Sequence, residues 1–116
     1  AEQMRSITVQ RVAEFSDRDY SITFGITKEE YGRMLMVLEE AYTHEHKRKP
    51  RFTKITMEDK LIITLIYRHE YRSMESIANE YEVSRDTIAD NIHWVERTLL
   101  NANLLESSVT CVYKTN

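Results

Sequence analysis

Residues 73–99 read SMESIANEYEVSRDTIADNIHWVERTL, and this stretch decides the fold. Ser73 precedes a short apolar pattern and Ser84 precedes a longer one. A serine hydroxyl accepts a hydrogen bond from the free backbone N–H groups of a helix's first turn. Ser73 therefore predicts a helix over residues 74–81, and Ser84 predicts a second helix that continues to about residue 105.

The apolar residues after each serine recur at helical spacing. Ile77, Ala78 and Tyr81 share one face of the first segment. The second segment carries a stripe at steps of four, three and four residues, formed by Ile88, Ile92, Val95 and Leu99. One apolar face in each segment is typical of amphipathic helices that pack on a common core.

The turn between the two predicted helices is short, as in a helix-turn-helix. This motif needs a small residue in the first helix and apolar residues around the turn, and Ala78, Val83 and Ile88 stand at that spacing. Two positions differ from the usual pattern. Glu82 stands where a glycine often makes the turn, and Asn91 stands where a third apolar residue often packs. The spacing predicts a helix-turn-helix with two unusual positions.

The face of the second helix opposite its apolar stripe is the candidate surface for reading DNA bases. It carries Arg85, Asp86, Ala89, Asp90 and His93. An arginine suits guanine or a phosphate, and a carboxylate suits the amino group of cytosine. Residues 72–97 hold three basic and six acidic residues, and the whole chain has a formal net charge of −3. General DNA binding by this helix is therefore unfavourable, and any DNA contact must be focused.

The positive charge lies in residues 43–56, THEHKRKPRFTKIT. This stretch contains Pro50, the only proline, and we expect it to be an extended loop. Exposed N–H groups at the start of the Ser84 helix can also bind an anion. We predict that the loop's basic residues contact DNA phosphates, and these residues are Lys47, Arg48, Lys49, Arg51 and Lys54.

Two longer helices are predicted ahead of the helix-turn-helix. Thr27 precedes residues 28–42, with Glu30 three positions later as in a capping box. Thr56 precedes residues 57–70, whose first turn is acidic and whose last turn is basic, the order that the helix dipole favours. The centre of this second helix is apolar on nearly all sides, which predicts that it is the buried central helix.

A shorter element lies between Ser16 and Gly25. Ser16 as a cap and Gly25 as a stop indicate a short helix. Tyr20, Ile22 and Phe24 also alternate as the residues of a strand do. The pattern favours a helix and leaves the strand open.

The composition fits one all-α domain of about five helices. The 116 residues hold two glycines and one proline, too few for the turns of a sandwich or a barrel. We expect a single DNA-binding domain over residues 1–106, with the helix-turn-helix at 74–99, and a tail or the start of a further domain at 107–116. A single cysteine, Cys111, and an opening that does not resemble a leader peptide predict a cytoplasmic protein. The longest apolar run, residues 61–67, is too short for a membrane span.

Residues 55–99, ITMEDKLIITLIYRHEYRSMESIANEYEVSRDTIADNIHWVERTL, resemble the N-terminal helix-turn-helix domain of DDE-class insertion-sequence transposases, often encoded as a first short reading frame. The upstream SDRDYSITFGITKEEYGRMLMVLEEAY and the basic KRKPRFTKIT are also similar to that family, so the resemblance spans roughly residues 16–100. It implies a bacterial protein that binds the terminal inverted repeats of a mobile element. It also implies a catalytic transposase domain encoded downstream, which holds the family's metal-binding acids.

The resemblance places the helix-turn-helix on double-stranded DNA, with the second helix in a groove. The outward positions of that helix are then the candidates for base contacts. We predict that these contacts come from Ser84, Arg85, Thr87, Ala89 and His93.

The sequence predicts no catalytic, cofactor or metal site. His44 and His46 stand in the basic stretch without a third ligand at fixed spacing. Adjacent carboxylates such as Glu58 and Asp59 diverge by about 100° on a helix and do not converge on one substrate. With two glycines, the chain has no glycine-rich phosphate loop. We therefore expect a binding protein rather than an independent enzyme.

Two other functions fit the same pattern. A free-standing transcriptional regulator would share the fold and recognise an operator. A protein-interaction module would use the acidic second helix against a basic partner and would not bind DNA. Apolar residues late in the second helix are also candidates for a homodimer contact, namely Trp94, Leu99, Leu100, Leu104 and Leu105.

Overall fold

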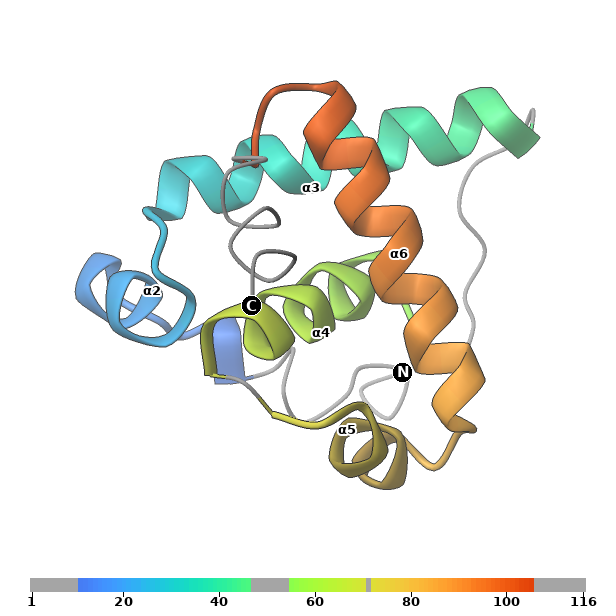
Figure 1. Ribbon diagram of the computed structural model, residues 1–116. Helices are drawn as coiled ribbons and strands as arrows, with labels where there is room; N and C mark the ends of the chain where they lie inside the picture. Colours follow the sequence, from blue (N-terminus) through green and yellow to red (C-terminus); the bar gives the residue numbers. More distant parts are fainter. Residues whose placement is uncertain (1–10, 47–54, 71, 106–116) are drawn as a thin grey trace, which may run out of the picture.

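The computed structural model describes residues 11–46, 55–70 and 72–105, and most of these lie in helices joined by short turns (Figure 1). Within these three stretches there is no strand. The predicted all-α class with about five helices is therefore confirmed. The helices are α2 (Asp17–Phe24), α3 (Lys28–His46), α4 (Met57–Glu70), α5 (Met74–Tyr81) and α6 (Arg85–Asn101).

Helix α4 is the centre of the fold, with the other four helices around it (Figure 1). It packs against α2, α3 and α6. Leu61, Ile62 and Ile63 have no exposed surface, and Leu65 is also buried. A helix that is covered on several sides needs apolar residues around most of its circumference. The prediction of a buried central helix over residues 57–70 is confirmed.

The short element α2 is a helix, so the strand alternative is wrong. Ser16 accepts a hydrogen bond from the backbone N–H of Asp19, and the Asp19 carboxylate accepts one from the backbone N–H of Ser16. Gly25 ends the helix with a left-handed φ of 74°. Tyr20 and Phe24 lie four residues apart and are both buried, as one face of a helix requires.

Helix α3 is one turn longer than predicted, because it ends at His46 rather than at residue 42. His44 and His46 therefore lie in the last helical turn, and the prediction that they stand in an extended loop is wrong. The extra turn packs on α6. The rings of Tyr42 and Trp94 meet edge to face at a centroid distance of 6.4 Å, and the Trp94 Nε1 group donates to Glu45 Oε1 at 3.1 Å. These contacts between distant parts of the chain stabilise the last turn of α3, whose own sequence carries no signal for where the helix ends.

Helix α6 ends at Asn101, about one turn before the predicted end near residue 105. Asn103 adopts a left-handed φ of 61°. The backbone N–H of Leu104 then donates to the carbonyl of Leu99 at 2.9 Å. This bond belongs to the Schellman arrangement that commonly ends a helix, and asparagine tolerates the left-handed region better than most residues do.

The apolar side chains form two clusters. The larger one joins α2, α3, α4 and the C-terminal half of α6, with Leu38, Leu61 and Leu99 fully buried in it. The smaller one lies beneath the helix-turn-helix and consists of Ile55, Ile63, Ile77, Ala78, Ile88 and Ile92. Val83, in the turn, packs against this smaller cluster. The structure thus confirms the predicted roles of Ala78, Val83 and Ile88 in holding α5 and α6 together.

Candidate nucleic-acid interface

The turn between α5 and α6 sets the angle of the helix-turn-helix. Glu82 follows α5 with a left-handed backbone, φ 58° and ψ 45°. The backbone N–H of Val83 donates to the Ala78 carbonyl at 3.0 Å, and that of Glu82 donates to the Asn79 carbonyl at 3.2 Å. Glycine is common at such a position because it has no Cβ. In this chain a glutamate takes the same conformation, and the turn keeps its geometry.

Helix α6 begins with a serine cap, as predicted. Ser84 Oγ accepts a hydrogen bond from the backbone N–H of Thr87 at 3.1 Å. The two side-chain hydroxyls of Ser84 and Thr87 also lie within hydrogen-bonding distance, 2.9 Å apart. Both residues are exposed. The start of α6 is therefore fixed in place at the surface.

A buried carboxylate joins the helix-turn-helix to α4. Asp59 has no exposed surface, and one of its oxygens accepts from the backbone N–H of Thr56 at 3.2 Å and from the Thr56 hydroxyl at 2.9 Å. Its other oxygen accepts from the Tyr81 hydroxyl at 3.2 Å. Tyr81 is the last residue of α5, so this junction holds the end of α5 against the start of α4. The sequence showed an acidic first turn in α4 but not this role of Asp59.

Asn91 occupies the position where a third apolar residue often packs, and it makes polar contacts instead. It is half-buried, and its side-chain carbonyl accepts from the ammonium group of Lys60. Its amide group donates to the Thr87 carbonyl at 2.8 Å. Burial lowers the pKa of the Lys60 ammonium group below its ordinary value. The two polar side chains thus satisfy each other between α4 and α6.

The outward face of α6 presents most of the predicted base-contacting residues to solvent. Ser84, Arg85, Thr87 and His93 are exposed, and Ala89 is half-buried. The apolar stripe of α6 points the other way, into the two clusters. The structure therefore places the five predicted positions at the start and in the first half of α6, outside its apolar stripe. Their contact with DNA stays a prediction.

Ion pairs neutralise most of the arginines around this helix. Arg85 Nε lies 2.8 Å from Glu75 Oε2, which links the first turn of α6 to the first turn of α5. Two further pairs, Arg68 with Glu96 and Arg72 with Glu80, have N–O distances of 2.7 Å. Neither the sequence pattern nor the resemblance indicated these pairs.

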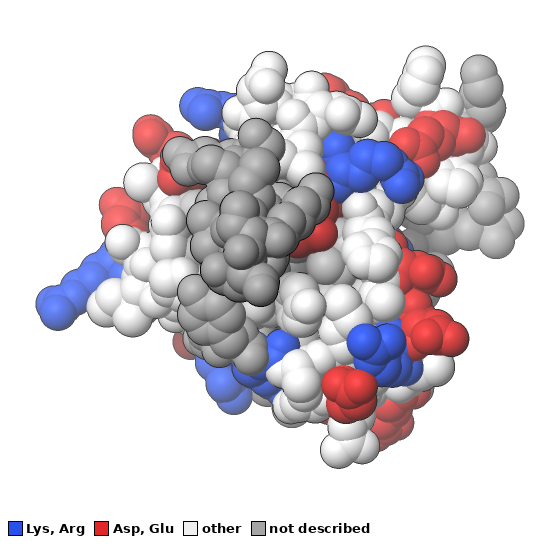
Figure 2. Space-filling view, in the orientation of Figure 1, with Lys and Arg blue, Asp and Glu red and all other residues white. Residues whose placement is uncertain are grey.

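Acidic side chains stand out on the same side of the molecule. Asp86 and Asp90 are exposed, and neither has an ion-pair partner among the residues that the structure describes. Figure 2 shows Asp and Glu side chains along the right-hand edge, where α6 runs in Figure 1, with Lys and Arg side chains between them. This face repels a phosphate backbone unless specific contacts compensate.

The residues predicted to contact phosphates lie outside the part of the chain that the structure describes. These residues are Lys47, Arg48, Lys49, Arg51 and Lys54, and the predicted tail at residues 107–116 also lies outside it. The described residues stop at His46 and resume at Ile55, on either side of the basic segment, residues 47–54. Ile55 is buried in the cluster beneath the helix-turn-helix, so the basic segment joins the polypeptide next to that motif.

The residues predicted for a homodimer contact have different positions in the fold. Leu99 is fully buried in the larger cluster, so it is a core residue and not part of an intermolecular surface. Trp94 and Leu100 are half-buried. Leu104 and Leu105 pack against the larger cluster.

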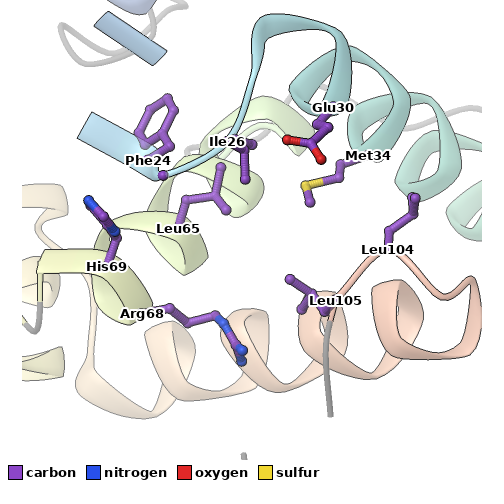
Figure 3. Close-up of a pocket in the computed structure, with 10 residues that line it drawn as sticks. Phe24, Ile26, Glu30, Met34, Leu65, Arg68, His69, Leu104 and Leu105 are labelled. Carbon is purple, nitrogen blue, oxygen red and sulfur yellow. The ribbon is translucent and has the colours of Figure 1, made fainter. Parts of the chain in front are cut away.

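Leu104 and Leu105 also line a pocket of about 430 Å³ between α2, α3 and α4 (Figure 3). The side chains of Phe24, Met34 and Leu65 give it an apolar wall, and Arg68 lies at its edge. None of the predicted base-contacting residues lines this pocket. It is therefore separate from the outward face of α6.

Neither a metal site nor a membrane span is found in the described parts of the chain. Among these residues, no three His, Cys, Asp or Glu side chains converge as metal ligands would. None of the described helices has the length and apolar character that crossing a bilayer requires.

Comparison with known proteins identifies the motif. Residues 53–101 match the family model described as the helix-turn-helix of DDE superfamily endonuclease. No curated protein and no solved structure gives a significant match. The matched stretch covers α4, α5 and α6, which are the helices that build the candidate interface. Residues 53–101 are therefore similar to the helix-turn-helix of DDE superfamily endonucleases.

Proposed function

We propose that this chain is the DNA-binding part of an insertion-sequence transposase and recognises the terminal inverted repeats of its element. The observation that carries the proposal is the match of residues 53–101 to a helix-turn-helix of DDE superfamily endonucleases, in a fold that exposes one face of α6. A downstream catalytic domain would cleave and join the DNA strands. The present chain would bring that domain to the element ends.

Base recognition is assigned to the outward face of α6. A helix of this kind lies in the major groove, and its N-terminal residues contact base edges. Arg85 offers a guanidinium group to guanine, and the exposed Thr87 and His93 offer further hydrogen-bonding groups, Thr87 in the first turn of α6 and His93 about two turns after Arg85. Ser84 and Ala89 complete the set, with Ala89 small enough for a close approach to a thymine methyl group.

The attraction to the DNA backbone is assigned to the basic segment. Its residues Lys47, Arg48, Lys49, Arg51 and Lys54 supply the positive charge that α6 lacks. Backbone contacts position a protein on the duplex, whereas base contacts select the sequence. A helix with an acidic face binds weakly to random DNA, so separating the two tasks favours a specific target over the rest of the genome.

A protein-interaction module remains the second candidate because Asp86 and Asp90 are exposed, with no ion-pair partner in the described chain. A basic partner could bind this face in place of DNA. A transcriptional regulator would use the same face on an operator, and it differs from a transposase in its target alone.

Binding measurements on two duplexes test the proposal. One duplex contains the terminal inverted repeat that flanks the coding region, and the other is a scrambled version of equal composition. Fluorescence anisotropy, measured from about 50 to 200 mM salt, should show tighter binding to the repeat than to the scrambled duplex. The affinity for each duplex should fall as the salt concentration rises. Absence of binding to either duplex at 50 mM salt would leave the protein-interaction module, and equal binding to both would exclude recognition of the repeat.

A further inference from the structure

Glu75 and Arg85 form an ion pair that spans the helix-turn-helix. Glu75 is the second residue of α5 and Arg85 is the first residue of α6. The Arg85 Nε group donates to Glu75 Oε2 at 2.8 Å. The side chains are 54% and 69% exposed for Arg85 and Glu75, so water surrounds the pair. An ion pair this exposed contributes little to folding stability, because water and salt screen it.

The position of the contact on the guanidinium group matters for recognition. A guanidinium has two edges with parallel N–H groups, and one of them contains Nε. Glu75 holds Arg85 through Nε, and Arg85 makes no other hydrogen bond within the described chain. The edge formed by Nη1 and Nη2 is therefore available. Two parallel N–H groups are what guanine O6 and N7 accept from an arginine in the major groove.

We propose that Glu75 is a specificity-determining positioning residue, which holds Arg85 so that its Nη1–Nη2 edge reads a guanine. The inference rests on the proposed DNA-binding function. A free arginine loses rotamer freedom when it docks on a base, whereas a side chain already held by a neighbour loses less. The carboxylate of Glu75 contributes to selectivity in a second way, because it repels phosphates and lowers the affinity for DNA without the guanine.

The substitution Glu75→Gln tests this role because it removes the charge and keeps the size. Glu80→Gln is a matched control: Glu80 also lies on α5 and pairs with an arginine, Arg72, that is not on α6. Each protein is used to select duplexes from a library randomised over the binding site. The parent chain and Glu80→Gln should enrich a guanine at one position, and Arg85→Ala should lose that preference.

For Glu75→Gln we compare the affinity for the selected duplex with the affinity for a duplex in which that guanine is replaced. We expect the ratio of these two affinities to be three- to tenfold smaller than in the parent chain. This is the range expected when one side chain must be newly ordered. Affinity for unrelated DNA should stay equal or rise. A structural defect would instead lower both affinities together. Arg85→Lys provides an independent test, because it keeps the charge and can still pair with Glu75, but it has no Nη1–Nη2 edge. It should bind DNA and lose the guanine preference.

The outcomes separate the two proposals. A guanine preference in Glu75→Gln equal to that of the parent chain would overturn the positioning role, and so would a preference retained by Arg85→Lys. Both results would leave the DNA-binding function intact. A parent chain that enriches no sequence and binds no duplex would overturn the DNA-binding function itself.

Discussion

Two glycines illustrate how single residues set the backbone of this fold. Gly25 has a φ of +74°, and a Cβ at that position would lie 2.9 Å from His69 Nδ1. The His69 ring is itself placed by a contact of 3.2 Å between its Nε2 and the Ile22 carbonyl. Gly32 lies in α3, and a Cβ there would meet no atom within 4 Å. The same substitution should therefore act in opposite directions at the two positions.

We predict that Gly25→Ala destabilises the protein by about 1–2 kcal/mol, because an L residue is strained in the left-handed region. Gly32→Ala should stabilise it by about 1 kcal/mol, because alanine favours a helix interior. Urea unfolding followed by circular dichroism measures both free energies of unfolding. An equal loss in the two variants would show that neither the φ of Gly25 nor its contact with His69 matters.

Glu82 presents the reverse case, because a residue with a Cβ occupies a left-handed position with a φ of 58°. Glu82→Gly should raise the free energy of unfolding by about 0.5–1 kcal/mol, since glycine relieves the strain but loses more entropy on folding. Glu82→Ala keeps the strain and should give no such gain. If the alanine variant were as stable as the glycine variant in the same unfolding experiment, the charge of Glu82 and not its backbone would be the cause.

Residue roles were predictable from the sequence where they depend on local spacing. The caps at Ser73 and Ser84 and the exposure of Arg85 follow from which positions share a helical face. The pairing of Arg85 with Glu75 was not predictable. It depends on the angle between α5 and α6 and on two side-chain rotamers, which one-dimensional spacing does not contain.

At the scale of the elements, the junction of Asp59, Thr56 and Tyr81 couples α4 to the helix-turn-helix. Tyr81→Phe should lower the free energy of unfolding by about 1 kcal/mol, because a buried carboxylate loses one hydrogen-bond donor. Tyr42→Phe is the matched control: Tyr42 is half-buried, and its hydroxyl makes no hydrogen bond within the described chain. Denaturant unfolding compares the two, and an unchanged stability in Tyr81→Phe would remove this junction from the account.

Helix starts were easier to predict than helix ends. The starts of α4, α5 and α6 follow capping residues that the sequence displays, and the predicted range of α4, residues 57–70, agrees with the structure. The C-terminal ends of α3 and α6 were misplaced by about one turn. The end of α3 depends on contacts of Tyr42 and Glu45 with Trp94, and the end of α6 depends on the left-handed Asn103. The end of α3 is thus decided by packing between elements, and the end of α6 by a local cap at a residue other than glycine.

At the scale of the whole molecule, charge is the property that separates binding to any DNA from recognition of one site. The net charge of the chain is −3, so the basic segment must provide most of the attraction to phosphates. Reversal of Lys47, Arg48 and Lys49 to glutamate should weaken binding to every duplex. It should also reduce the slope of log affinity against log salt by about 0.9 for each lost phosphate contact.

A matched triple reversal controls for net charge. Arg18, Lys28 and Arg33 lie on α2 and α3, are exposed, and carry none of the predicted DNA contacts. Their reversal to glutamate should leave the salt slope unchanged, although long-range repulsion lowers the affinity slightly. Equal losses of slope in the two triple variants would mean that overall charge, and not the basic segment, governs the attraction.

A nuclear magnetic resonance titration of the ¹⁵N-labelled protein with the terminal-repeat duplex tests directly whether α6 reads DNA, through the backbone amide signals. We expect the largest shifts in the basic segment and in the first half of α6, at Ser84, Arg85, Thr87, Ala89 and His93. Signals of the apolar pocket lined by Phe24, Met34 and Leu65 should change little. Shifts confined to α2 and α3, with α6 unaffected at saturating DNA, would contradict the assignment of α6 as the DNA-reading helix.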